Sequence, residues 1–204
     1  FSPGACSLSP HIALREAGLD FELERVDFAT KKTRGGEDFL AVNPKGRVPA
    51  LATERGILTE TPAILAYVAQ AFPAAGLAPL DDPFAFAELQ AFNSYLCSTV
   101  HVNHAHRPRG SRWADEATSL ADMKRKVPET MTASMRLIED DYLKGPWVLG
   151  ERYSVADGYL FTLGNWLEGD GVEVGRLPRI LDHRARMAAR PAVQRARAAE
   201  QGKG

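Results

Sequence analysis

The sequence is poor in cysteine, with only Cys6 and Cys97 among 204 residues. The two lie far apart and form neither a CxxC pair nor metal-ligand spacing, so a disulfide scaffold is not indicated. We expect both thiols to stay reduced, and we therefore expect the protein to be cytoplasmic.

Long hydrophobic runs and a strong net charge are also missing. No uninterrupted apolar stretch approaches the roughly 20 residues that span a bilayer, so we expect no membrane association. Residues 1–20 lack a basic region followed by an apolar core, so we expect no signal peptide. The formal net charge is -1, which provides no field that gathers nucleic acid, and the C-terminal arginines lack interleaved aromatic residues. We expect no nucleic-acid partner.

The first part of the chain has mixed helix and strand patterns. Residues 9–17 read as a helix stopped by Gly18, and residues 21–28 alternate like a half-buried strand. Residues 48–53 and 57–59 flank a short turn and predict a hairpin. Residues 62–72 then have helical periodicity, with Pro62 in the first turn.

Beyond a stretch rich in proline, glycine and aspartate, the pattern is helical only. The sequence therefore predicts an α/β domain followed by an all-helical domain. The predicted boundaries are 1–76 for the α/β domain, 77–83 for the linker and 84–204 for the helical domain. Ser154 and Asp157 have the spacing of a capping box and predict a helix start within the second domain.

Cys6 lies in a turn-like stretch that leads into the first helix. A thiol at a helix N-terminus meets free backbone N–H groups and the positive end of the helix dipole, which favour the nucleophilic thiolate. Free cysteine is equally often a small buried apolar residue. Ser7 beside it is either a helix cap or a second donor toward a bound thiol.

Two further segments carry candidate binding groups. Val48-Pro49 enters a strand, and a cis bond there would expose the Val48 backbone to an added peptide strand; an ordinary loop is the alternative. Glu60 and Thr61 precede a helix, where they serve either as capping groups or as receptors for a ligand carboxylate and ammonium.

The three segments occur together in an order and at spacings that resemble the cytosolic glutathione transferases, most closely their bacterial beta class. They are Ser2–Leu8, Asn43–Leu51 and Thr59–Ile64. The resemblance covers nearly the whole chain. It implies a thioredoxin-like first domain, a helical second domain, glutathione as co-substrate, and a homodimer.

The resemblance also implies roles for individual residues. Cys6 matches the cysteine beside the glutathione sulfur, and Val48 before a cis Pro49 matches the backbone that pairs with the cysteinyl part. Glu60 and Thr61 match the pair that holds the γ-glutamyl end. Lys31 matches a lysine toward the glycine carboxylate, and His101 matches a histidine that faces the thiol.

Two positions depart from the family pattern. Phe1 stands where many relatives have a tyrosine, so no hydroxyl is available there to bind a thiolate. Ser94 replaces an asparagine often found about one turn before the histidine, and we expect it near the ligand. A thioredoxin-like first strand also needs several residues ahead of Phe1, so we expect the whole protein to begin earlier.

Histidines invite a metal interpretation, but we expect no metal site. His101 and His104 are three residues apart and could share a helix face, yet no carboxylate or cysteine completes a ligand set. Pro108 is expected to end that helix, which would leave His104 and His106 on the surface.

The sequence thus predicts a glutathione transferase that conjugates apolar electrophiles, performs Cys6-centred thiol–disulfide exchange, or does both. The alternative is a ligand carrier or interaction module that keeps the fold without turnover. Trp113, Phe161 and Trp166 are expected to line the electrophile pocket. Cys6, Ser7 and His101 are the predicted catalytic residues.

Overall fold

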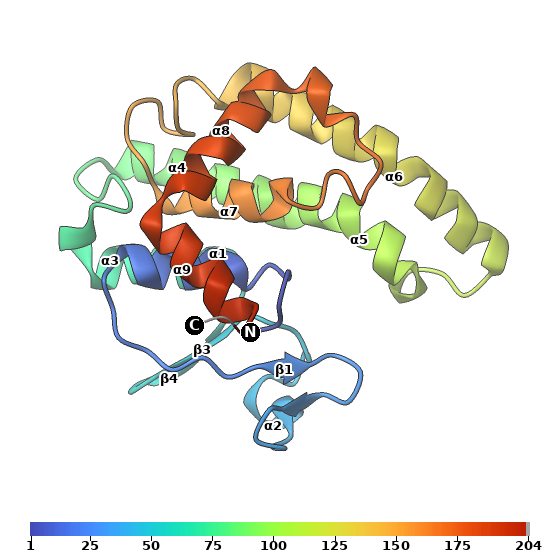
Figure 1. Cartoon of the computed structure of the whole chain (residues 1–204), viewed down its shortest axis with the longest axis horizontal. Coiled ribbons are helices and arrows are strands. Elements are labelled where there is room, and N and C mark those ends of the chain that lie inside the picture. The colour runs from blue at the N-terminus through green and yellow to red at the C-terminus, as the bar shows by residue number, and fades with distance from the viewer. Residues whose placement is uncertain (203–204) are drawn as a thin grey trace.

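The computed structural model describes residues 1–202. The chain forms a small α/β domain at one end and a larger helical domain, with α1 and α3 between the strands and the helices of the second domain (Figure 1). The fold class predicted from the sequence is confirmed. No helix in residues 1–202 is long and apolar enough to cross a membrane.

The α/β domain contains two short antiparallel ladders. One pairs β1 (Val26–Asp27) with β2 (Lys32–Thr33), and the other pairs β3 (Ala50–Thr53) with β4 (Gly56–Thr59). The predicted hairpin is confirmed, in the register Ala50 to Thr59. The predicted strand 21–28 is reduced to β1, because residues 21–25 have no ladder partner within the described chain.

Three helices complete this domain. They are α1 (Leu8–Glu16), the short α2 (Phe39–Val42) and α3 (Thr61–Ala71). Gly18 has a φ of 68°, which suits the residue after a helix end and confirms the predicted stop of α1. Every residue of α1 from Leu8 to Ala13 is buried, because α1 packs on α3 and also on α7 and α9 of the second domain.

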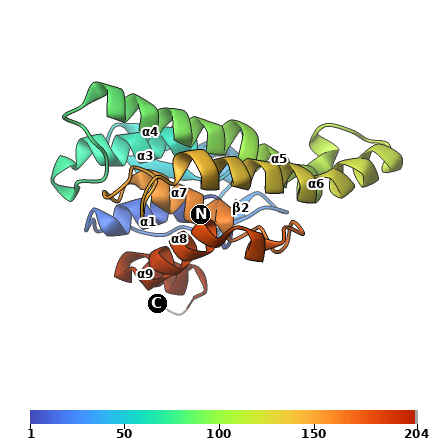
Figure 2. The same cartoon turned by 90° about the horizontal axis from the view of Figure 1, so that it is seen from above.

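The second domain begins with one long helical rod that passes through a π-helical turn. Its parts are α4 (Pro83–Tyr95), η2 (Leu96–Val100) and α5 (His101–Arg109), and α6 (Ala117–Leu137) lies beside it (Figure 2). The last helices are α7 (Val155–Gly164), α8 (Pro178–Ala189) and α9 (Pro191–Glu200). Short one-turn segments connect them: η1 (Pro73–Ala75), η3 (Gly110–Arg112), η4 (Ile138–Tyr142) and η5 (Val174–Arg176).

The helix α7 is the centre of the second domain, and all of its residues are buried. The predicted capping box at its start is confirmed: the Ser154 hydroxyl accepts from the Ala156 N–H, and the Asp157 carboxylate accepts from the Ser154 N–H at 2.8 Å. On the face toward α1, Gly158 lies against Ile12. The contact between α1 and α7 thus joins the two domains.

Candidate active site

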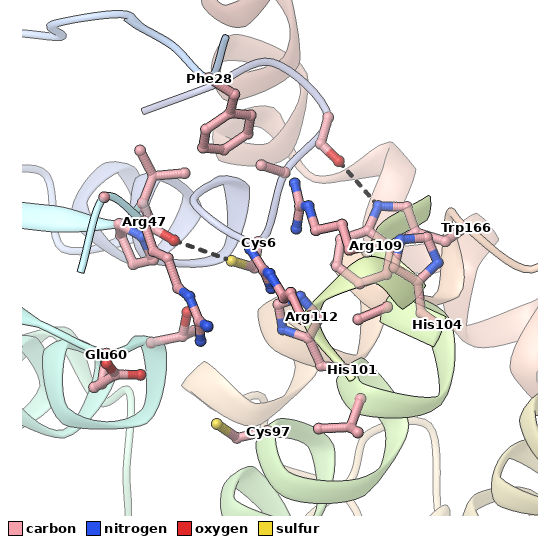
Figure 3. Close-up of a pocket in the computed structure, with 18 of the residues that line it drawn as sticks. Cys6, Phe28, Arg47, Glu60, Cys97, His101, His104, Arg109, Arg112 and Trp166 are labelled. Carbon is pink, nitrogen blue, oxygen red and sulfur yellow. Dashed lines mark hydrogen bonds between the residues drawn. The ribbon is translucent and has the colours of Figure 1, made fainter. Parts of the chain in front are cut away.

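A cavity of about 360 Å³ opens between the two domains (Figure 3). Loops before α1 and α3 and around β3 line one wall, and η2, α5, η3 and α7 line the other. Its volume falls within the range of small-ligand sites. The predicted residues Cys6, Lys31, Val48, Glu60 and Thr61 all line it, although they come from separate segments of the chain.

Cys6 lies at the floor of this cavity, where its thiol donates to the Val48 carbonyl oxygen at 3.4 Å. The side chain is nearly buried. Burial raises the pKa of the Cys6 thiol to about 11, and the Thr61 hydroxyl and the Arg109 charge offset this only in part. Burial therefore opposes the thiolate that the helix start was expected to favour.

Ser7 is turned away from the cavity, contrary to the prediction. Its hydroxyl accepts from the Ser2 N–H at 3.2 Å and donates to the Ser2 carbonyl at 3.3 Å. It is buried and does not line the cavity. The Ser7 hydroxyl thus closes the turn that carries Cys6, and the role of thiol donor does not fit it.

The bond between Val48 and Pro49 is cis, which decides between the two interpretations of this dipeptide. Val48 is buried and packs with Val26 and Phe39 beneath the cavity. Asn43 fixes the approach to it, because its side-chain amide donates to the Arg47 carbonyl at 2.6 Å. The loop before β3 therefore presents the Val48 backbone directly beside the Cys6 sulfur.

Glu60 and Thr61 mark the start of α3 at another side of the cavity. Glu60 has a φ of 72°, a left-handed conformation that residues other than glycine adopt at an energetic cost. Its carboxylate forms an ion pair with Lys45, while Thr61 is buried in the cavity wall. The strained turn directs both side chains and the free N–H groups of the helix toward the cavity.

Lys31 lies at the cavity edge and also has a left-handed backbone, with a φ of 57°. Its ammonium donates to the Gly46 carbonyl at 3.0 Å and lies 5.3 Å from the centre of the Phe28 ring. Both contacts hold the cation at the cavity wall. This placement suits the predicted recognition of a carboxylate.

His101 begins α5 directly after the π-helical turn and lines the cavity. Burial lowers the pKa of His101 to about 4, and the charges of His104 and nearby arginines add to the effect. Its ring therefore stays neutral at physiological pH and acts through hydrogen bonding rather than charge.

His104 is not a free surface residue, contrary to the prediction. Its Nδ1 lies 2.8 Å from the buried carboxylate of Asp170, and its ring stacks on Trp166 at 4.1 Å between centroids. The Trp166 Nε1–H in turn donates to the Gly4 carbonyl at 2.9 Å. In residues 1–202, no group of three histidine, cysteine or acidic residues could hold a metal ion.

Two other predicted residues lie outside the cavity. Ser94 is exposed on α4 and is absent from the lining, because it points away from the helix face that carries Cys97 and His101. Phe161 is buried in a cluster with Leu8 and Met187. Trp113 and Trp166, by contrast, line the cavity as expected.

Comparison with known proteins identifies the architecture. Residues 2–70 match the model of the glutathione S-transferase N-terminal domain. Glutathione S-transferase GstA of Escherichia coli O157:H7 is 36% identical over 203 residues, which cover 98% of this chain and 96% of the relative. The chain belongs to the glutathione S-transferase family. It is an enzyme that uses glutathione as its co-substrate.

Solved structures agree with this assignment. A glutathione transferase homologue from Sulfitobacter with bound glutathione is 49% identical, with a TM-score of 0.92 and coverage of 100% of this chain and 97% of that one. The bacterial beta class glutathione S-transferase of Sphingomonas chungbukensis is 37% identical, with a TM-score of 0.89 and coverage of 100% and 98%. The resemblance inferred from three sequence segments is confirmed.

Several residues of this transferase's cavity were missed by the sequence analysis. Cys97, Arg109 and Arg112 line it from the helical domain, and Arg47 lines it from the loop before Val48. Arg109 lies eight residues after His101, so helical periodicity could have placed both on one face. Pro108 obscured that signal, because it was taken as the helix end whereas α5 continues to Arg109.

Proposed function

We propose that this enzyme conjugates glutathione to an electrophile in the cavity between its domains. The γ-glutamyl end would lie at the start of α3 beside Glu60 and Thr61, and the cysteinyl backbone would pair with Val48. Lys31 would receive the glycine carboxylate. The observation that carries the proposal is the convergence of these groups, with Cys6, on one cavity.

Cys6 would act as a protonated thiol. With a pKa of about 11, only about one molecule in ten thousand carries the Cys6 thiolate at pH 7. The neutral S–H is a hydrogen-bond donor and can turn from the Val48 carbonyl toward a glutathione thiolate placed next to it. Such a bond stabilises the bound thiolate and lowers the pKa of the glutathione thiol.

In the reaction, the glutathione thiol first loses its proton to solvent. The thiolate then attacks the electrophilic carbon, forming a carbon–sulfur bond while the leaving group departs with the electron pair. The neutral imidazole of His101 lies on the opposite cavity wall, where it can donate or accept a hydrogen bond at the reacting sulfur. Thiol–disulfide exchange at Cys6 remains a second activity, slow at neutral pH because the thiolate is scarce.

The decisive experiment compares wild type with Thr61→Val, using Thr118→Val on α6 as the matched control. Calorimetry should show glutathione binding to wild type and to the control, with affinity reduced about tenfold in Thr61→Val because a buried hydroxyl partner is lost. Turnover of 1-chloro-2,4-dinitrobenzene should accompany binding. Glutathione binding without turnover of any electrophile would make the protein a carrier and refute the proposal.

We also propose that the enzyme works as a homodimer. Large apolar side chains are exposed on the α3 and α4 side of the molecule, including Phe84, which is 74% exposed at the start of α4, and Ile57 on β4. Exposed apolar side chains of this size favour burial in an interface. Light scattering after size exclusion tests this, and Phe84→Glu should shift a dimer toward monomer.

We further propose that the enzyme acts in the cytoplasm. Both Cys6 and Cys97 are free thiols, and neither is paired within the structure. A reducing compartment keeps such thiols from oxidising. Fractionation of the producing cells with antibody detection would test this, and recovery from an oxidising compartment would contradict it.

A further inference from the structure

We propose that the electrophile carries a carboxylate, bound by Arg112 at the mouth of the cavity, beside an aromatic wall that receives a flat ring or conjugated chain. This inference rests on the proposed function, because it names the substrate class of the same site. It replaces the sequence-based expectation of a simply apolar electrophile.

The cavity carries an excess of positive charge. Its lining contains four permanent cations, Lys31, Arg47, Arg109 and Arg112, and one carboxylate, Glu60. Glu60 is already paired with Lys45, which lies outside the lining. The site is therefore electropositive although the whole chain has a net charge of -1. A local excess of one sign in a cleft attracts ligands of the other sign.

The cavity arginines have no carboxylate partner in the described part of the chain. Within residues 1–202, none of Arg47, Arg109 and Arg112 has a carboxylate within 4.0 Å, whereas Arg184 and Arg190 pair with Glu168 and Glu16. Burial lowers the pKa of Arg112, and the neighbouring charges of Arg47 and Arg109 lower it further. An anion bound among these groups would relieve their mutual repulsion.

Glutathione alone does not use all of this charge. Glutathione has two carboxylates and one ammonium. In the proposed pose, Thr61 binds one carboxylate, Glu60 binds the ammonium, and Lys31 binds the other carboxylate. Arg109 lies 5.2 Å from the Phe28 ring that Lys31 also faces, so it supports the same end of glutathione. Arg112 is the cation of the helical domain that remains for the second substrate.

The place of Arg112 fits this role. It ends η3, directly beyond α5, and Figure 3 shows its guanidinium near Cys6 and His101. The charge of Arg112 also contributes to the lowered pKa of His101. A carboxylate held there would leave the rest of the molecule within reach of the reacting sulfur.

Aromatic side chains form part of the cavity wall on the helical side. Trp166 and His104 form a stacked pair, which the Asp170 carboxylate and the Gly4 carbonyl hold in position. His101 lies 5.1 Å from Trp166 between centroids, and Trp113 adds a further ring at the mouth. Arg112 and these rings line the same cavity. Together they suit an aryl or conjugated carboxylate, which can meet the rings with its face and the arginine with its edge.

The reaction is the one proposed above with an anionic acceptor. For 4-chloro-3,5-dinitrobenzoate, the glutathione sulfur bonds to the ring carbon that carries chlorine, and chloride leaves with the bonding electron pair. The thiol proton goes to solvent. The carboxylate takes no part in the bond changes and only positions the ring.

The test compares 4-chloro-3,5-dinitrobenzoate with the neutral 4-chloro-3,5-dinitrobenzamide. Each kcat/KM is divided by the rate of the uncatalysed reaction with glutathione, which removes the difference in intrinsic reactivity. We expect wild type to prefer the carboxylate about fivefold to tenfold, since Arg112 is solvent-exposed and its ion pair is partly screened. The preference should shrink as salt is added. Equal values, or a preference for the amide, would overturn the proposal.

Variants assign the preference to a residue. Arg112→Gln should raise KM for the carboxylate and lower its kcat/KM more than that for the amide; Arg112→Lys should restore part of the preference. Arg125→Gln, an exposed arginine on α6 away from the cavity, is the matched control. Equal loss on both electrophiles in Arg112→Gln would contradict the assignment.

A binding measurement separates this inference from the proposed function. Calorimetry with S-(4-carboxybenzyl)glutathione and S-(4-carbamoylbenzyl)glutathione needs no turnover. Tighter binding of the carboxylate to wild type, lost in Arg112→Gln, supports the inference even if no electrophile is conjugated. Equal affinities overturn it even if 1-chloro-2,4-dinitrobenzene is turned over.

Discussion

The Cys6 thiol donates a hydrogen bond to the Val48 carbonyl oxygen, across 42 positions of sequence. The contact joins the start of α1 to the loop before β3, the two segments proposed to hold the sulfur and the backbone of glutathione. Only a protonated thiol can donate such a bond, so the contact is consistent with the raised pKa of Cys6.

Alkylation of Cys6 should therefore be slow at neutral pH. In a Cys97→Ala background, where Cys6 is the only cysteine, we expect the rate with iodoacetamide to rise about tenfold per pH unit from pH 7 to 9, since only the thiolate reacts. Intact-mass spectrometry measures the rate, and Cys6→Ala supplies the blank. A plateau below pH 9 would mean that the thiolate is favoured after all.

His101 should make the fold sensitive to acid. Its pKa is about 4 in the folded chain against an ordinary 6.5, so the unfolded state binds the proton first as the pH falls. The stabilisation is present above pH 6.5 and is lost between pH 6.5 and 4, amounting to about 2 kcal/mol by pH 5. Urea unfolding at pH 7 and pH 5 should show this loss in wild type and not in His101→Asn. Equal losses in both proteins would contradict the assignment.

Trp166 should matter for glutathione through one hydrogen bond. Trp166→Phe keeps a ring beside His104 and removes the donor to the Gly4 carbonyl, which steadies the loop that carries Cys6. We expect glutathione affinity to fall about fivefold, in line with about 1 kcal/mol for one hydrogen bond. Trp113→Phe is the control, because Trp113 lies at the mouth and is 46% exposed. If both variants bind glutathione as wild type does, the hydrogen bond from Trp166 to Gly4 does not support glutathione binding.

The capping box should contribute stability rather than catalysis. Ser154→Ala removes one cap and should lower the free energy of unfolding by about 1 kcal/mol. Asp157→Ala should lower it by about 3 kcal/mol or more, since Asp157 accepts from Val148, Ser154 and His183 inside the core. Asp82→Ala, at the exposed cap of α4, provides the comparison for a lone cap. Chemical denaturation measures all three, and similar losses for Asp157→Ala and Asp82→Ala would contradict this ranking.

The residues proposed to bind glutathione could be predicted from the sequence because each belongs to a short segment with its own turn chemistry. Cys6, Val48 and Thr61 lie within or beside a helix start or a proline turn, and the structure brings them to one cavity. The short segments did not reveal how deeply each side chain is buried. Burial decides the pKa of Cys6 and the orientation of Ser7, and burial depends on packing across the whole fold.

The wrong predictions for residues of the helical domain have a related cause. The rod from α4 to α5 contains a π-helical turn, which shifts the faces of the residues that follow it. The expectation for Ser94 rested on the family resemblance, which does not show how such a turn orients Ser94 relative to His101. The role of His104 depended on Asp170, which lies 66 positions away and has no sequence signal linking it to the histidine.

The burial of α1 has a consequence for how the molecule comes apart. This helix is in contact with α3 of its own domain and with α7 and α9 of the other, so neither domain can lose its structure without exposing apolar surface on the other. The helix α1 thus belongs to the packed core of both domains and does not act as a hinge between them. Melting followed by helical signal and by tryptophan fluorescence should give one coincident transition, and a truncated first domain should not persist as an independent glutathione binder.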